Sequence, residues 1–169
     1  MEAKFIVDIN AGKLARWLRL IGYDTLLFTD KDDSQMIKIA IEEGRIILTK
    51  DSQFMKRRLI TSGRIKALLV TGEDSNDQLR QTVEAFHLDY QHKPFSICLE
   101  CNCKLEARTK EEVKDLVPPY VFKTKTSFME CPCCHRIYWQ GTHWQSMESQ
   151  LENFSLISPL NQRSKDEGR

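Results

Sequence analysis

The chain has 169 residues, enough for one ordinary domain or for one domain and a small module. Its formal net charge is +1 and charged residues make up 29%, so total charge argues neither for nor against an anionic partner. No basic, apolar leader opens the chain, and no apolar stretch approaches the roughly 20 residues that a membrane span needs. We expect a soluble, cytoplasmic protein with no membrane partner.

Short apolar runs alternate with helical patterns over about the first half of the chain. Four runs have the length and composition of buried strands, namely residues 5–7, 25–28, 46–48 and 67–70. Each precedes a helical pattern, and such alternation is typical of β-α-β units with parallel strands. The expected fold class is therefore α/β, with a mainly parallel sheet flanked by helices.

Apolar residues at helical spacing predict two helices between these strands. The apolar residues of the first are Leu14, Trp17, Leu18 and Ile21, and those of the second are Met36, Ile37, Ala40 and Ile41. Gly22 and Gly44 follow, where a glycine commonly ends a helix. Residues 53–62 and 76–86 predict two further helices from weaker patterns.

Acidic residues follow each predicted strand. They are Asp8 after the first strand, Asp30, Asp32 and Asp33 after the second, Asp51 after the third, and Glu73 and Asp74 after the fourth. Right-handed connections put the carboxyl ends of the strands at one edge, so these carboxylates can converge. Oxygen ligands suit Mg²⁺ and Mn²⁺, and two such ions can promote phosphodiester cleavage. The pattern predicts a shared Mg²⁺ or Mn²⁺ site.

Helix capping is the alternative reading of these acids, because aspartate is a favoured N-cap and the loops precede helices. Asp33 stands just before the second predicted helix and is a natural cap. For the fourth helix we favour Asp77 as the cap over Asp74. Asp8 fits capping less well, since Asn10 lies closer to the first helix. We favour a shared metal site over four independent caps.

Basic residues stand beside the predicted acidic site. Lys13, Arg16 and Arg19 fall on one arc of the first helix, and Lys50 follows the third strand. A polar face is more often simply solvated. Because the helix begins close behind Asp8, these cations can also hold the phosphates of a polyanion against the acids, without reading its sequence.

Two C-x-x-C pairs occur in the second half of the chain, Cys98 with Cys101 and Cys131 with Cys134. Four thiolates at this spacing are typical of a tetrahedral zinc site. Such a site leaves no position for water, so the expected zinc is structural. His135 is an alternative ligand.

The remaining cysteines, Cys103 and Cys133, are predicted to be spare thiols, because disulfides rarely persist in a reducing cytosol. The first cysteines and a change of composition mark a domain boundary. We expect residues 1–93 to form the α/β domain, residues 94–155 a zinc ribbon with a closing helix, and residues 156–169 a disordered tail.

Inside the cysteine-rich part, a short helix is predicted at residues 110–116, and an amphipathic closing helix runs from Trp144 to Phe154. Tyr138, Trp139 and Trp144 stand near basic side chains, and aromatic rings beside cations can stack on bases. A role in the small core of the ribbon is at least as good a reading for Tyr138 and Trp144. Trp139 remains a candidate RNA contact.

Several separated motifs occur in order along this chain: "FIVDINAGKLARWLRLIGYDTL", "DSQMIKIAIEEGRIILTKD", "CLECNCKL" and "CPCCHRIYWQGTHW". With them, over about residues 5–150, the chain resembles the Mut7-C domain, a PIN-like ribonuclease fold with a C-terminal zinc ribbon. The resemblance implies a metal-dependent nuclease that acts on RNA, single-stranded or structured.

By this resemblance, Asp8, Asp33 and Asp51 are the metal-binding catalytic acids, and Asp74 is the best match to a fourth, less regular acid. The zinc ligands implied are the four cysteines of the two C-x-x-C pairs. A metal-activated water would attack the phosphorus, while the basic residues and the ribbon hold the RNA. The alternative is a non-catalytic RNA- or ribosome-binding protein whose acids only cap helices.

Overall fold

The structure is a computed structural model that describes residues 2–157. Contacts between residues divide the chain after Asn102 into two compact units, each with its own sheet. Composition changes earlier, near residue 93, and residues 94–102 belong to the first unit by their contacts. The predicted disordered tail is wrong at residues 156 and 157, which are helical, and its residues 158–169 lie outside the described residues.

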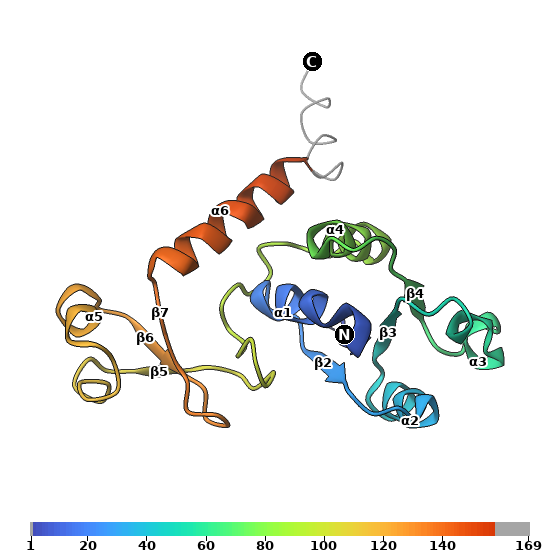
Figure 1. Ribbon diagram of the computed structural model, residues 1–169, viewed down its shortest axis with the longest axis horizontal. Coiled ribbons are helices and arrows are strands. Elements are labelled where there is room, and N and C mark those ends of the chain that lie inside the picture. The colour runs from blue at the N-terminus through green and yellow to red at the C-terminus, as the bar shows by residue number, and fades with distance from the viewer. Residues whose placement is uncertain (1, 158–169) are drawn as a thin grey trace, which may run out of the picture. The chain divides into compact units, whose positions relative to one another are not determined.

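A sheet of four parallel strands forms the centre of the first unit (Figure 1). The strands are β1 (Phe5–Asp8), β2 (Thr25–Phe28), β3 (Ile46–Thr49) and β4 (Ala67–Leu69), in the spatial order β2-β1-β3-β4. Phe5 pairs with Thr25 on one side and with Ile46 on the other, so β1, β2 and β3 are in register. The predicted strands and the predicted α/β class with a parallel sheet are confirmed.

Helices connect these strands and cover both faces of the sheet. They are α1 (Gly12–Leu20), α2 (Asp33–Glu43), α3 (Arg58–Thr61) and α4 (Ser75–Phe86), with 3-10 turns at Ile9–Ala11 and Phe54–Lys56. Phe5 contacts Phe86 of α4, whereas Ile6 packs with Met36 of α2. Successive strand residues point to opposite faces, so α1 and α4 cover one face and α2 and α3 the other.

The predicted helix pattern needs two corrections. Ile41 is 48% exposed, so the apolar face of α2 is narrower than predicted and contains Met36 and Ala40. The helix predicted at 53–62 is divided into a 3-10 turn and the single turn of α3. The glycine expected at the end of α2 is confirmed, because Gly44 adopts a left-handed φ of 65°.

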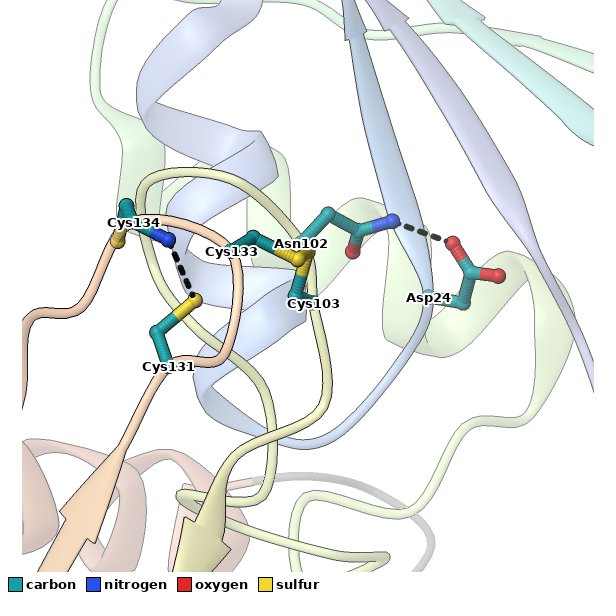
Figure 2. The surroundings of a disulfide bond; sticks show 6 residues. All are labelled: Asp24, Asn102, Cys103, Cys131, Cys133 and Cys134. Atoms are coloured by element: carbon teal, nitrogen blue, oxygen red, sulfur yellow. Dashed lines mark hydrogen bonds between the residues drawn. A yellow bond between two sulfur atoms is a disulfide. The ribbon is translucent and has the colours of Figure 1, made fainter.

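A buried arginine fixes the amino edge of the sheet. Arg45, which is 6% exposed, donates to both carboxylate oxygens of Asp24, at 2.8 and 3.2 Å, and to the carbonyl of Phe5 at 3.0 Å. Asn102 Nδ2 also donates to Asp24 Oδ1 at 2.6 Å, as Figure 2 shows. The Asn102 side-chain oxygen accepts from the N–H of Thr25 at 2.8 Å. These bonds attach the first cysteine pair to the first unit at this edge.

The network around Asp24 predicts a loss of stability in acid. Burial raises the pKa of the Asp24 carboxyl, but hydrogen bonds from Arg45 and Asn102 bring it below its ordinary value. This stabilisation is fully present above the unfolded pKa of about 3.9 and is lost as the pH falls through the folded pKa. The free energy of unfolding, measured with urea, should therefore fall more steeply between about pH 6 and 3 for wild type than for Asp24→Asn. Equal slopes, with Glu84→Gln as an exposed control, would contradict this expectation.

An antiparallel sheet of three strands organises the second unit. The elements are β5 (Glu106–Arg108), α5 (Pro119–Thr124), β6 (Phe128–Glu130), β7 (Ile137–Trp139) and α6 (Thr142–Ile157), with the strands in the order β5-β6-β7. The small core of this unit consists of Val113, Val117, Val121 and Phe128. Such a core leaves a unit of this size in need of a further staple.

The helices of the second unit match the sequence prediction in part. The helix predicted at 110–116 is wrong, because these residues form turns, and α5 follows at Pro119. Proline at the first helical position presets φ and loses no hydrogen bond. The closing helix is confirmed as α6, with Leu151 1% exposed, although the Phe154 side chain lies outside the described ones. None of the described helices combines the length and the hydropathy needed to span a bilayer.

Candidate active site and cysteine centre

The strand order creates a topological switch at the carboxyl ends of β1 and β3. β1 lies between β2 and β3, and the chain leaves β1 toward α1 on one face but leaves β3 toward α3 on the other. Open α/β sheets bind ligands outside the strand ends at such a point. Asp8 is the last residue of β1, and Thr49 is the last residue of β3. Lys50 and Asp51 follow, and these four residues define the candidate active site.

The Asp8 carboxylate joins the two strand ends. Its Oδ2 accepts hydrogen bonds from Thr49 Oγ1 at 2.5 Å and from the N–H of Lys50 at 3.0 Å. Its Oδ1 accepts from the N–H of Asn10 at 2.7 Å. Thr49 Oγ1 accepts in turn from the N–H of Asp51 at 3.0 Å. A single threonine, 1% exposed, therefore links the Asp8 carboxylate to the backbone of Asp51.

A local turn recurs after every strand of the parallel sheet. Asp8, Asp32, Asp51 and Asp74 each accept a hydrogen bond, of 2.7–2.9 Å, from the N–H two residues later. Asp32 and Asp74 are the N-caps of α2 and α4, and Asp8, which was expected to fit capping less well, is the N-cap of the 3-10 turn Ile9–Ala11. Local turn and cap geometry therefore accounts for one bond of each acid. It does not account for the bonds of Asp8 to the neighbouring strand.

Two of the caps considered from the sequence are wrong. Asp33 is the first residue of α2 rather than its cap, and its Oδ2 lies 2.9 Å from the Arg57 guanidinium. Asp77 pairs with Arg80, while Asp74 caps α4. Each error is a shift of one or a few residues along an acidic loop, where several side chains can serve as a cap.

The acids at the strand ends do not form a closed cluster. Within residues 2–157, no three carboxylates have oxygens that all lie within 4.8 Å of one another. Mg²⁺ usually keeps several waters and takes one or two carboxylates, so a closed cluster is not required. The Asp8 carboxylate and the backbone of Asp51, linked through Thr49, lie together at the switch.

Thr49 was not among the residues singled out from the sequence, although its position in the Thr-x-Asp strand exit is a usable signal. Thr49→Val should lower the free energy of unfolding by about 1–3 kcal/mol, because Asp8 loses a donor and the Asp51 N–H loses its acceptor. Amide exchange at Asp51 should become faster. Thr49→Ser keeps the hydroxyl and should keep the exchange slow; the same fast exchange in both variants would contradict the bridging role.

Three of the predicted phosphate-binding cations can be reached by solvent. Lys13 and Arg16 are exposed on α1, and Arg16 Nη1 lies 2.9 Å from Glu100 Oε1. Lys50 is half-buried, and its Nζ lies 2.8 Å from Glu73 Oε1. The Lys50 ammonium lowers the pKa of the Glu73 carboxyl. Ion pairs this exposed contribute little to stability, so a phosphate can replace their carboxylates at low cost.

The prediction that Arg19 lies on this basic face is wrong, because the residue is 4% exposed. Arg19 Nε donates to the carbonyl of Thr25 at 2.8 Å, and Nη1 donates to the carbonyls of Leu99 and Glu100 at 2.7 and 3.0 Å. Burial lowers the pKa of Arg19, while thiolate charge on the first cysteine pair acts to raise it. Arg19 thus holds the first cysteine pair, and it is not available to RNA.

Trp139 packs against the small core of the second unit and is half-buried. A side-chain carbon at Gly141 would lie 3.1 Å from the indole nitrogen, so the ring is also covered closely on that side. The core role weighed from the sequence for its neighbours therefore applies to Trp139 as well. Its contact with RNA stays a prediction.

Four cysteine sulfurs form a group that could hold a metal ion. The Sγ atoms of Cys98, Cys101, Cys131 and Cys134 all lie within 4.8 Å of one another, and none is in a disulfide. Cys98 and Cys131 are buried, while the other two are exposed. Four thiolates are the donor set of a tetrahedral zinc site. These are the four ligands expected from the spacing.

The two C-x-x-C pairs share one backbone geometry. The residue after each pair donates its N–H to the carbonyl of the first cysteine, Asn102 to Cys98 at 3.1 Å and His135 to Cys131 at 2.9 Å. Both residues adopt a left-handed φ, of 66° and 59°. The N–H of Cys134 also donates to Cys131 Sγ at 3.5 Å, as Figure 2 shows. The Cys131 sulfur thus has a backbone donor directed at it from within its own turn.

Cys103 and Cys133 are joined by a disulfide (Figure 2), so the prediction that they are spare thiols is wrong. His135, the alternative ligand, places its Nδ1 3.1 Å from Glu130 Oε1. Among the described residues, it is in neither group that could hold a metal ion. The cysteine centre therefore combines a four-sulfur group with a disulfide.

Residues 3–151 match the family described as the Mut7-C RNAse domain. The chain belongs to the Mut7-C RNAse domain family. This Mut7-C chain is also 31% identical, over 103 residues, to a Homo sapiens protein named exonuclease mut-7 homolog. That alignment covers 59% of this chain and 12% of the human protein. No solved structure matches the chain.

Family membership confirms the resemblance stated from the sequence motifs. It supports a nuclease-type function for this Mut7-C chain and implies a nucleic-acid substrate. The chain spans only a small part of the human protein, whose name describes the whole of that protein.

Proposed function

We propose that this Mut7-C chain is a cytoplasmic, Mg²⁺- or Mn²⁺-dependent ribonuclease that hydrolyses phosphodiester bonds of RNA. The observation that carries the proposal is the Asp8 carboxylate at the switch point, which accepts hydrogen bonds from its own turn and from the end of β3. A carboxylate that only capped a helix would not need the bonds to β3. The nuclease-type family supports the reaction class.

Asp8 and Asp51 would hold the divalent cation, with Asp33 as a further ligand and Asp74 as a fourth acid. A bound Mg²⁺ or Mn²⁺ supplies charge neutralisation at the phosphate and lowers the pKa of water. A carboxylate has about four sites that can accept a hydrogen bond or bind a cation. Three donors occupy three of these sites on Asp8, so one site remains for a cation. The Gln53 N–H donates to Asp51 Oδ1 at 2.7 Å and fixes that side chain locally. Both carboxylates are thus held before any ligand arrives.

Exposed cations would hold the RNA phosphates beside these acids. Lys13 and Arg16 on α1 would contact the backbone of the strand, and Lys50 would exchange Glu73 for a phosphate near Asp8. Such contacts position a strand without selecting its sequence. A structural zinc held by the four-cysteine group would keep the ribbon folded, and Trp139 would add an aromatic contact to RNA.

Cleavage assays on the whole chain test this proposal. Labelled single-stranded RNA and DNA of the same sequence are incubated with Mn²⁺, with Mg²⁺ and with EDTA. We expect RNA cleavage with metal only, and a loss of about 10²-fold or more in Asp51→Asn. Asp77→Asn, which alters an ion pair on α4, is the control and should cleave at the wild-type rate.

Each alternative outcome has a distinct meaning. Cleavage at the wild-type rate by Asp51→Asn, or in EDTA, would contradict the metal site. Preferential cleavage of DNA would contradict the proposal that RNA is the substrate, but it would agree with the proposed nuclease activity. RNA binding without cleavage by wild type would favour the non-catalytic RNA-binding protein, since the local turn at every acid is what that reading expects.

A further inference from the structure

Cys103 and Cys133 form a disulfide within the second unit, outside the four-sulfur group. Cys103 precedes β5, and Cys133 lies in the turn between β6 and β7. The bond closes a loop with a sequence separation of 30. It therefore joins the start of the three-stranded sheet to its last turn, where Figure 2 shows it beside Cys131 and Cys134.

Bonding, and not exposure, separates this pair from the four-sulfur group, because Cys101 and Cys134 of that group are exposed as well. Cys98 and Cys131 are 0% exposed, and Cys131 Sγ accepts the N–H of Cys134. Cys133 is exposed and Cys103 is half-buried. A small soluble thiol or disulfide can therefore reach Cys133, while coordination to zinc would occupy the thiolates of the four-sulfur group. Disulfides in a reducing compartment are usually transient or redox-sensing, which suits such a pair.

We propose that Cys103 and Cys133 are a site of reversible thiol–disulfide exchange with low-molecular-weight disulfides of the glutathione type. The exposed Cys133 thiolate attacks one sulfur of the small disulfide, and the other half leaves as a thiolate. Cys103 then attacks the Cys133 sulfur of this mixed disulfide and releases the second half as a thiolate. The two cysteines lose two electrons, the small disulfide gains them, and the two thiol protons pass to the released thiolates. Excess small thiol drives the same steps backwards.

The bond has a structural consequence for the second unit. The small core of Val113, Val117, Val121 and Phe128 lies in the part of the chain between the two cysteines. Closing a loop of this length reduces the number of conformations open to the unfolded chain, and this loss of entropy stabilises the folded unit relative to the unfolded one. The oxidised unit should thus keep its fold when zinc is removed, whereas the reduced unit should depend on zinc. This inference is independent of the proposed nuclease activity.

A second role for the same sulfurs must be distinguished. The Sγ atoms of Cys101, Cys103, Cys131 and Cys133 also lie within 4.8 Å of one another. Sulfurs in a disulfide are not thiolates and cannot hold zinc as Cys ligands do. Reduction would free both, so a second zinc ion in the reduced protein is the competing outcome.

The first experiment equilibrates the whole zinc-loaded chain in glutathione buffers of increasing oxidised fraction. Thiols are trapped with iodoacetamide, and peptide mass spectrometry locates the unmodified cysteines. We expect Cys103 and Cys133 to change together from alkylated to disulfide-bonded, with the zinc content constant. A second zinc in the reduced protein, or oxidation that removes zinc before this pair responds, would overturn the proposal.

The second experiment melts the oxidised and the reduced wild-type chain in EDTA, followed by near-ultraviolet circular dichroism. The oxidised chain should keep the near-ultraviolet signal of the second unit and lose it in a cooperative melt, whereas the reduced chain should lack this signal already before heating. The double variant Cys103→Ser, Cys133→Ser should keep zinc and lose the response to the buffer. The same signal and the same melting temperature in both wild-type forms would overturn the structural consequence, and this comparison holds even if the double variant does not fold.

Discussion

Asp8→Asn is expected to lower the rate of RNA cleavage by about 10³-fold or more while the chain stays folded. The substitution removes the negative charge and keeps the shape. The new amide oxygen can accept from Thr49 and Lys50, but the amide nitrogen then faces the N–H of Asn10. One lost hydrogen bond costs about 1 kcal/mol of unfolding free energy, far less than the expected loss of catalysis. Single-turnover cleavage at saturating Mn²⁺ and urea unfolding measure the two effects.

Asp30→Asn is the matched control for this variant. Asp30 follows β2 and accepts from the N–H of Asp32 at 3.1 Å, two residues later, as Asp8 accepts from Asn10. No described hydrogen bond joins the Asp30 side chain to a neighbouring strand. We expect a change of less than about 3-fold in Asp30→Asn, within the variation of a surface substitution. Similar losses in both variants would show that the turn, and not the bridge to β3, is what activity requires.

Cys131→Ser is expected to abolish zinc binding and, in the presence of reductant, the folding of the second unit. Structural zinc contributes about 10–16 kcal/mol of apparent binding free energy in small domains, more than a small core can replace. Zinc content should fall to near zero. The near-ultraviolet signal of Trp139 and Trp144 should disappear. The far-ultraviolet signal of α1 to α4 in the first unit should remain.

Cys103→Ser in the same reductant is the control, because Cys103 lies outside the four-sulfur group. It should keep zinc and the tryptophan signal. Wild-type zinc content in Cys131→Ser would mean that the remaining sulfurs suffice, with Cys103 or Cys133 as a substitute ligand. Loss of zinc in Cys103→Ser would instead assign that cysteine to the metal.

The sequence predicts the parallel sheet well because each strand combines an apolar run with a following acidic or glycine-containing turn. The bond between Asp8 and Thr49 follows from the neighbouring positions of β1 and β3, which no local pattern specifies. The predicted N-caps lie one to three residues away from the observed caps, Asp32 and Asp74. Several aspartates in each loop have the same propensity to cap a helix, so the sequence does not distinguish them. The local sequence thus identifies the acidic loops, but it does not show which acid caps a helix and which one bonds to a neighbouring strand.

Arg19 shows a different limit of prediction. Helical spacing places it with Lys13 and Arg16, but it does not reveal that a segment 80 residues later covers the end of α1. The same limit applies to Cys103 and Cys133, whose bond depends on where two turns meet in space. The spacing of the four zinc cysteines is informative because a C-x-x-C pair is itself local. The sequence does not by itself show that the two pairs lie close together, and this follows only from the structure.

The first cysteine pair and Asp8 lie at opposite ends of the parallel sheet. Asn102 attaches the pair beside Asp24 and Thr25 at the amino edge, whereas Asp8 ends β1 at the carboxyl edge. Strands of four residues, at about 3.3 Å each, separate these edges by roughly 13 Å. Salt screens charges at this separation where solvent lies between them, and much less through a buried sheet. A substitution at the amino edge, such as Asn102→Ala, would therefore release the first cysteine pair without removing any hydrogen bond that holds the Asp8 carboxylate.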